Sequence, residues 1–296
     1  MSQEWQFATK THTPVMPKEV LSHLNVQKDG IYVDGTIGLG GHSQLILSQL
    51  SPKGHLIGVD RDAEALRICK RRLSTCHSSL SLFNKSYHKI NSILDSLEIE
   101  KVNGILLDLG LSSLQLESKD RGFSYKTDCD LDMRFNRSQK KSAFNIVNNL
   151  PEKMLADLIY YNSEEKRSRA IARKITSMRP ISKVFDLIEA IRRSTPPFKR
   201  DKTISRVFQA IRIAVNNELE KLEQFLSIFY PRLLNGGRIV IISFHSLEDR
   251  KVKHAFKLLK NKNKMKILTK KPLIPSTREV VENSRSKSAK LRAAER

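Results

Sequence analysis

The sequence has few cysteines, no long apolar run and a shortage of acidic residues, and the first two absences exclude whole classes of protein. Its 3 cysteines include no CxxC pair, which argues against a disulfide framework or a metal site and predicts reduced thiols. No apolar run approaches the ~20 residues of a membrane span. The opening residues, MSQEWQFATK, lack the charged and apolar regions of a signal peptide. We therefore expect a cytoplasmic protein with no membrane partner.

The shortage of acidic residues leaves a strongly basic chain. A total of 53 Lys and Arg against 31 Asp and Glu gives a formal net charge of +22. Residues 250–296 carry 16 Lys and Arg against 3 acids, so 13 of the 22 charges lie there. This imbalance favours a polyphosphate partner over a merely solvated surface. With 296 residues, of which 39% are hydrophobic, the chain can form about two domains, or one large domain with an insertion.

Residues 31–60 have the pattern of the first half of a nucleotide-binding βαβ unit. An apolar strand ends in Asp34, a loop with four glycines and a helix follow, and a second strand ends in Asp60. Glycines let the backbone approach a ligand closely, and the helix aims its free N–H groups at the turn. Asp60, about twenty residues beyond the turn, is placed to accept hydrogen bonds from both hydroxyls of a ribose. The pattern favours a nucleotide-like ligand over a structural turn.

A third acid closes the clearest buried strand, residues 102–109, at Asp108. Because parallel strands end at one edge of a sheet, we expect Asp34, Asp60 and Asp108 to converge on one crevice. Buried carboxylates without partners would each cost several kcal/mol, so a binding role is favoured. Tyr87 follows a weak third strand, where it either caps the core or packs on an adenine ring; the spacing does not decide between them.

The rest of the chain predicts an insertion and a return to the sheet. Residues 111–139 have no sustained period and predict a long structured loop that shapes a substrate site. Further helices are expected at 151–160, 164–178 and 182–194, and one long amphipathic helix at 204–230. A buried strand at 238–243 precedes a basic helix, an edge strand and a basic tail. The predicted domains are 1–116 (sheet domain, first part), 117–203 (helical insertion for substrate recognition) and 204–296 (sheet domain, second part).

Two classes of nucleotide enzyme fit the opening unit, namely hydride transfer with NAD and methyl transfer with S-adenosylmethionine. The dehydrogenase fingerprint is G-x-G-x-x-G, whereas residues 38–42 are G-L-G-G-H, without the third glycine in place. Near the end of the chain, LLNGGRIVIIS places a Gly-Gly turn and a hydrophobic strand after a helix. That arrangement resembles the later part of a class I methyltransferase, so methyl transfer is favoured.

Several motifs spread over nearly the whole chain are more specific: DGTIGLGGHS, VDRD, GILLDLGLSS, LDMRF and GGRIVIISFHSLEDR. They closely resemble those of the bacterial ribosomal RNA small-subunit methyltransferase H family. The resemblance implies an α/β fold, with a class I S-adenosylmethionine-dependent methyltransferase (Rossmann-like) sheet and a helical insertion domain. It implies methylation of the exocyclic N4 amine of a cytidine in the decoding centre, with 16S rRNA or the small ribosomal subunit as partner. Formation of a homodimer is left open. The implied S-adenosyl-L-methionine site comprises Gly40, Gly41, His42, Asp60, Tyr87, Asp108 and Gln115.

The chemistry of such a transfer suggests catalytic residues. The lone pair of the cytidine amine is delocalised into the ring, so a site can help by holding amine and methyl in line and by accepting the amine N–H bonds. Our hypothesis is that Asp108 orients cofactor and amine, with Ser243 and His245 beside the base. His245 is either a proton acceptor or a structural residue of the SFHSLED turn. His42 acts through its imidazole or only through its backbone.

The long loop offers candidates for holding the substrate. The cytidine must leave its stack, and Phe123, Tyr125 or Phe135 is expected to hold it by stacking. We expect no metal site, and we predict that Asp130 and Asp132 pair with nearby arginines, Arg134 or Arg137, to order the loop.

Other functions fit parts of the sequence. A related enzyme could methylate amines of another RNA or of DNA, and an NAD enzyme is the remaining enzymatic alternative. A non-catalytic RNA-binding factor in ribosome assembly would need only the basic surfaces. The intact glycine loop, Asp60 and Asp108 favour turnover.

Overall fold

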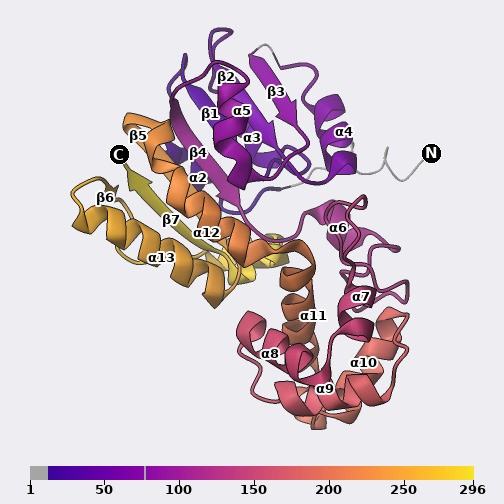
Figure 1. The fold of residues 1–296 in the computed structure, drawn as a ribbon. Helices are drawn as coiled ribbons and strands as arrows, with labels where there is room; N and C mark the ends of the chain where they lie inside the picture. Colours follow the sequence, from indigo (N-terminus) through magenta and orange to yellow (C-terminus); the bar gives the residue numbers. More distant parts are fainter. Residues whose placement is uncertain (1–12, 77) are drawn as a thin grey trace. The chain divides into compact units, whose positions relative to one another are not determined.

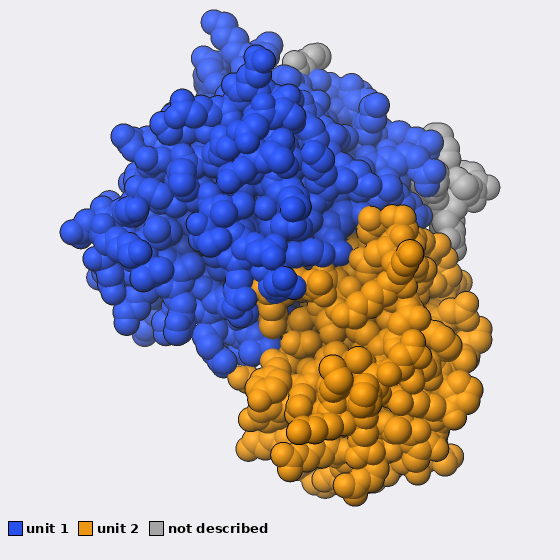
Figure 2. Space-filling model, in the orientation of Figure 1, with its two compact units in different colours: residues 1–112, 220–296 blue, residues 113–219 orange. Residues whose placement is uncertain are grey.

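The computed structural model describes residues 13–76 and 78–296, which fold into two compact units (Figure 1, Figure 2). The first unit comprises residues 1–112 and 220–296, and the second comprises residues 113–219. The expected absence of a signal peptide concerns residues 1–10, which lie outside the described residues. In the part of the chain that is described, no helix is both long and apolar enough to span a bilayer.

A seven-stranded sheet in the order β3-β2-β1-β4-β5-β7-β6 forms the centre of the first unit. Its strands are β1 (Ile31–Asp34), β2 (His55–Val59), β3 (Ser79–Phe83), β4 (Val102–Asp108), β5 (Leu233–Ser243), β6 (Lys266–Ile267) and β7 (Lys290–Glu295). Strands β1 to β5 pair in parallel, and β7 runs antiparallel to both β5 and β6. This confirms the predicted α/β fold with the class I methyltransferase (Rossmann-like) sheet. The order reverses at β1, and the switch point beside that strand is where open sheets bind ligands.

Helices cover both faces of the sheet (Figure 1). They are α2 (Pro17–Leu24), α3 (Gly41–Leu47), α4 (Ala63–Arg72), η1 (Tyr87–Lys89), α5 (Ile90–Asp95), α12 (Glu218–Ile228), η3 (Tyr230–Arg232), α13 (Ser246–Asn261), α14 (Thr277–Glu282) and η4 (Ser284–Ser288). Side chains alternate along each strand, so Ile105 and Leu107 of β4 point to one face and Leu106 points to the other. Helices α5, α12 and α13 pack on the first face, and α2, α3 and α4 pack on the second.

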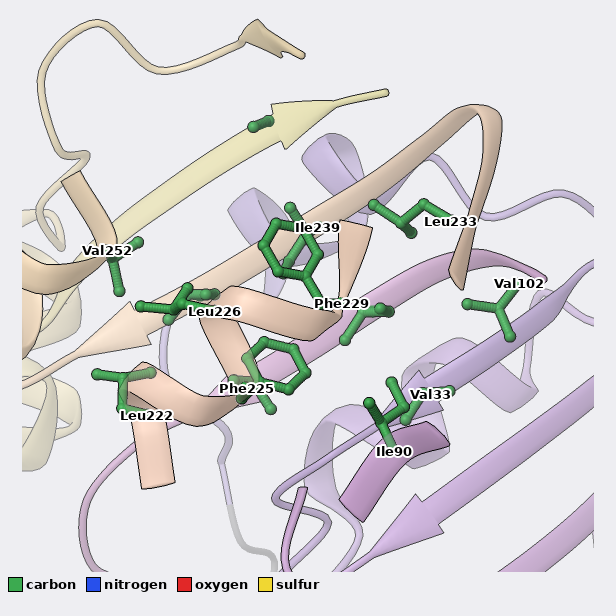
Figure 3. Close-up of a cluster of buried hydrophobic side chains, with 14 of the residues drawn as sticks. Val33, Ile90, Val102, Leu222, Phe225, Leu226, Phe229, Leu233, Ile239 and Val252 are labelled. Carbon is green, nitrogen blue, oxygen red and sulfur yellow. The ribbon is translucent and has the colours of Figure 1, made fainter. Parts of the chain in front are cut away.

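Aromatic side chains fill the face under α12 and α13. Figure 3 shows Phe229 beside Ile239, in a buried cluster that also contains Phe225, Val102 and Val252. The Phe225 and Phe229 rings stack with centroids 5.6 Å apart and are fully buried. Burial of such side chains contributes about 1.5–3 kcal/mol each, which holds β4 and β5, the strands that carry Asp108 and Ser243, in a rigid core.

The predicted single helix at 204–230 is wrong, because two helices occupy this region. Helix α11 (Arg200–Asn216) ends at Asn217, whose backbone is left-handed (φ 51°, ψ 44°), and α12 begins at Glu218. Asn tolerates this conformation better than most residues, so it ends a helix without the help of glycine. The apolar periodicity continues across the break, which is why the sequence pattern does not reveal it.

The end of the chain contains the expected edge strand, but the expected basic tail is partly an inner strand. Strand β7 lies between β5 and β6, so the short β6 is the edge. Leu291, Ala293 and Ala294 of β7 are fully buried. The guanidinium of Arg292 forms two hydrogen bonds to Asp249 of α13, of 2.6 and 3.1 Å. The positive charge of this segment is therefore partly neutralised inside the fold, and its apolar residues complete the core.

The second unit is built from helices α6 (Ser113–Glu117), α7 (Ala143–Asn149), α8 (Glu152–Ser163), α9 (Ser168–Ser177), α10 (Val184–Arg193), η2 (Pro197–Lys199) and α11. It extends beyond the predicted insertion of 117–203 at both ends. At the later end the reason is packing, since α11 contacts α7, α8 and α10. Helix α7 was not expected; Ser142 caps it by accepting a hydrogen bond from the Asn145 N–H.

Candidate functional site

The loop after β1 has a backbone shape that requires glycine. Gly38 and Gly40 have φ angles of 50° and 83°, which L side chains rarely adopt. A Cβ atom on Gly40 would also lie 3.0 Å from Cys69 Sγ. Gly40 caps α3 and Gly41 is its first residue. The loop is therefore packed closely against α4. Contact of Gly40 and Gly41 with a cofactor stays a prediction.

Asp34, the first of the three strand-end acids, shapes this loop. Its Oδ1 accepts a hydrogen bond from the Thr36 N–H at 3.2 Å and its Oδ2 accepts one from the Ser43 hydroxyl at 2.7 Å. The side chain is buried, and burial raises its pKa to about 6. Because both oxygens bond to the loop and to α3, we assign Asp34 a structural role.

Asp60 lies at the end of β2 and holds the loop from the other side. Its Oδ2 accepts a hydrogen bond from the Gly38 N–H at 2.8 Å, and its Oδ1 accepts one from the Asp62 N–H at 2.9 Å. Burial raises the pKa of this carboxyl to about 6. The backbone N–H of Arg61 bonds to the same carboxylate. A carboxylate offers about four acceptor positions, so capacity remains for a ligand hydroxyl.

Asp108 differs from Asp34 and Asp60 in its hydrogen bonds, because one of its carboxylate oxygens accepts none from the described residues. Its backbone N–H donates to Thr36 Oγ1 at 2.6 Å, which fixes the end of β4. Its Oδ2 lies 3.6 Å from His42 Nδ1, while its Oδ1 is buried without a hydrogen-bond partner in the described part of the chain. Burial, and then the negative charges of Asp34 and Glu248, raises the Asp108 pKa well above its usual value.

The imidazole of His42 links Asp108 to the N-terminal segment. Its Nε2 lies 2.8 Å from the carbonyl oxygen of Val15. A carbonyl only accepts hydrogen bonds, so Nε2 carries a hydrogen and Nδ1 faces Asp108. The side chain is 6% exposed. Its ring, and not its backbone alone, is therefore part of the arrangement at the sheet edge.

Tyr87 packs on the core. Its ring meets Phe225 edge-on at 5.5 Å, and it lies beside the cluster under α12. A Cβ atom on Gly35 would come within 2.9 Å of Tyr87 Cβ, so the tyrosine backbone sits directly against the start of the glycine loop. Tyr87 thus caps the core, and stacking on an adenine ring stays a prediction.

Ser243 and His245 both serve the junction between β5 and α13. The buried Ser243 hydroxyl donates to the Lys290 carbonyl of β7 at 3.3 Å. His245 caps α13, with Nδ1 accepting from the Glu248 N–H at 3.4 Å. Its Nε2 is 3.2 Å from Glu248 Oε1 but makes no well-oriented hydrogen bond within the described residues. These contacts favour the structural interpretation of His245; a direct role beside the base stays a prediction.

Glu248 is a residue of this site that the sequence analysis did not single out. It is 2% exposed, its Oε2 accepts from the Phe244 N–H at 2.9 Å, and its charge raises the Asp108 pKa. The signal that could have found it is its position three residues after the helix cap, where a glutamate commonly bonds back to the preceding turn.

The long loop of the second unit is ordered by ion pairs, partly as predicted. The Asp132 carboxylate accepts two hydrogen bonds from Arg134, of 2.7 and 2.9 Å, which confirms that pairing. Asp130 pairs with Lys183 instead of an arginine. Asn216 of α11, which the sequence analysis did not name, donates to the Met133 carbonyl and accepts from the Phe135 N–H. Within residues 13–76 and 78–296, no group of three His, Cys, Asp or Glu side chains could hold a metal ion.

The remaining predicted residues of the second unit vary in exposure. Gln115 is buried in α6, and its contact with a cofactor stays a prediction. Phe123 is buried and stacks on Phe135 with centroids 5.6 Å apart. Tyr125 is 45% exposed. Of the three proposed platforms for a base, Tyr125 is therefore the one whose ring is most open to a ligand.

The chain matches the MraW methylase family over residues 9–296. It belongs to this family. Relatives named ribosomal RNA small subunit methyltransferase H include those of Thermosipho africanus and Kosmotoga olearia. The first is 50% identical, with 96% of this chain and 97% of the relative covered. The second is 49% identical, with 97% and 98% covered. The MraW methylase match therefore spans both the sheet unit and the helical unit.

Proposed function

We propose that this protein transfers a methyl group from S-adenosylmethionine to the exocyclic N4 amine of a cytidine in the decoding centre of 16S rRNA. The main observation in support of this proposal is the pair of carboxylates, Asp60 and Asp108, at the switch point of the sheet. Asp60 accepts backbone hydrogen bonds from Gly38, Arg61 and Asp62 and keeps acceptor capacity for a ligand hydroxyl. Asp108 has a buried oxygen without a partner in the described residues. The names of the relatives support ribosomal RNA of the small subunit as the substrate.

The residues present fit this cofactor. The remaining acceptor capacity of Asp60 suits a ribose hydroxyl, and the positive φ angles of Gly38 and Gly40 favour a loop without side chains at these positions. The residues proposed to hold the cofactor are Gly40, Gly41, His42, Asp60, Tyr87, Asp108 and Gln115. When bound, S-adenosylmethionine supplies an electrophilic methyl group.

Asp108 is the proposed catalytic residue of the transfer. One proton must leave the amine nitrogen as it becomes methylated, and Asp108 Oδ1 is an acceptor that the fold leaves unused. Its raised pKa makes the carboxylate a stronger base than an ordinary aspartate. His42 Nδ1 lies 3.6 Å from Oδ2, next to this carboxylate. Ser243 and His245 keep the end of β5 in position through Lys290 and Glu248.

The decisive experiment is incubation with labelled S-adenosylmethionine and small ribosomal subunits from cells that lack this activity, followed by nucleoside analysis. We expect label in N4-methylcytidine, and its loss with the Asp60→Ala variant, whose ribose acceptors are missing. Label in another nucleoside, or in DNA but not in subunits, would point to a related amino-methyltransferase. Cofactor binding without transfer to subunits or naked RNA would favour the non-catalytic assembly factor.

Cofactor affinity is expected to depend on pH through Asp60. Its pKa of about 6 means that the carboxylate is ionised above that pH and protonated below it. Since the ionised form accepts the ribose hydroxyls, affinity should be constant near neutral pH and fall by up to about tenfold per unit as the pH drops below the pKa. Calorimetric titration with S-adenosylhomocysteine measures this. Asp60→Asn should bind more weakly at neutral pH and lose most of the dependence; an unchanged dependence would exclude Asp60 as its source.

A further inference from the structure

An exposed phenylalanine projects from the second unit. Phe198 lies in η2, between α10 and α11, and is 82% exposed. Two prolines, Pro196 and Pro197, precede it and restrict the backbone of the turn. A single exposed apolar side chain is common on protein surfaces, so exposure alone says little. The groups around this ring are more informative.

The surroundings of Phe198 are strongly basic. Residues 192–202 carry five Lys and Arg against one acid. The Lys199 ammonium lies 5.2 Å from the centre of the Phe198 ring. Arg167 of the segment before α9 reaches the same turn, where its Nε and Nη2 donate to the Ser194 carbonyl at 3.1 and 2.8 Å. Arg200 Nε donates to the Thr195 carbonyl at 3.3 Å. These guanidinium groups are held by neutral carbonyl oxygens, so their positive charge is not cancelled by these bonds.

An exposed aromatic ring next to several cations favours single-stranded nucleic acid as the ligand. An aromatic face stacks on any unpaired base, and the cations beside it attract the phosphates on either side of that base. A second copy of the chain would bring like charges together at the same surface. A membrane-binding segment needs an apolar face of several residues, whereas here one ring stands among cations.

We propose that the surface formed by Arg167, Phe198, Lys199 and Arg200 binds single-stranded RNA, with an unpaired base stacked on Phe198 and neighbouring phosphates on the cations. We call it the Phe198 surface. It is a further RNA contact of the second unit, distinct in its residues from Tyr125 and the long loop. The inference rests on the proposed function only for the identity of the RNA.

The test is the binding of a short fluorescent RNA that forms no secondary structure, measured by anisotropy at several salt concentrations. Phe198→Ala should weaken binding about 5- to 150-fold, whereas Phe198→Trp should retain it. Lys199→Gln should lower the slope of log affinity against log salt by about 0.7.

Tyr161→Ala is the matched control, because Tyr161 is also an exposed aromatic of this unit, at 70%, and this variant should bind like the wild type. A duplex RNA should bind Phe198→Ala and the wild type alike.

Two outcomes would overturn the proposal. Equal affinity of Phe198→Ala and the wild type for single-stranded RNA would exclude the stacking role. Concentration-dependent self-association of the wild type that Phe198→Ala abolishes, without an effect on RNA, would assign the surface to a second copy. Methyl transfer by the wild type distinguishes the two proposals: transfer with no effect of Phe198→Ala on RNA binding contradicts only the surface. RNA binding through Phe198 without transfer to any nucleic acid contradicts only the enzymatic function.

Discussion

The Asp108→Asn variant should transfer methyl groups about 10²- to 10⁴-fold more slowly than the wild type, because general base catalysis contributes roughly that factor. The amide has nearly the same shape as the carboxylate but cannot accept a proton. Asp108 Oδ1 is a buried acceptor without a partner among the described residues, whereas both oxygens of Asp34 and of Asp60 accept hydrogen bonds. Affinity for S-adenosylhomocysteine should change only a few-fold.

Single-turnover rates as a function of pH give the sharper measurement. The Asp108 pKa is raised above the usual value, so the wild-type rate should rise as the pH increases through that pKa and then level off. Asp108→Asn should lack this rise. Asp62→Asn is the matched control, because Asp62 caps α4 at the same edge of the sheet and Asn caps helices equally well. A full rate for Asp108→Asn at normal cofactor affinity would refute the proposed role.

The second large effect concerns stability. Replacing Arg292 by Met should lower the free energy of unfolding by about 3–5 kcal/mol, because it leaves the Asp249 carboxylate nearly buried without its partner. The two side chains are only 8% and 14% exposed and are joined by two hydrogen bonds. Urea unfolding followed by circular dichroism measures the loss.

Two further variants make this prediction specific. Replacing both residues, Arg292→Met with Asp249→Leu, should recover much of the stability, since no uncompensated charge remains. Arg278→Ala breaks an exposed pair with Glu282 and should leave the stability nearly unchanged, because water screens the pair. A loss below about 1 kcal/mol for Arg292→Met would show that β7 is not anchored through this pair.

Local pattern was sufficient for the first strands of the sheet. The apolar runs at β1, β2 and β4 and the acids that close them appear where the sequence predicts, because strand periodicity and glycine turns are properties of short segments. Local pattern failed at Asn217, where one backbone conformation breaks a helix without interrupting the apolar period. It also failed at β7, whose many charges suggested a solvated tail.

In the candidate site, too, some features follow from the local sequence and others depend on tertiary contacts. Three aspartates at three strand ends look equivalent in the sequence, and convergence at one edge follows from parallel topology. Their different roles depend on contacts with Thr36, Ser43 and Gly38, and on the absence of such a contact at Asp108 Oδ1 within the described residues. The hydrogen-bond partner of His42 is the backbone carbonyl of Val15, 27 residues away. Because every residue has such a carbonyl, the sequence does not reveal this contact.

The sequence alone therefore determined the fold class, the position of the glycine loop and the acids that border it, since these follow from periodicity, turn chemistry and spacing along the chain. Tertiary structure alone decided which acid keeps an unused oxygen, which histidine faces it, and how the basic C-terminal segment becomes an inner strand. The physical reason is that burial and hydrogen-bond satisfaction depend on groups brought together from distant segments. Arg292 meeting Asp249 and His42 meeting Asp108 are contacts that no local pattern encodes.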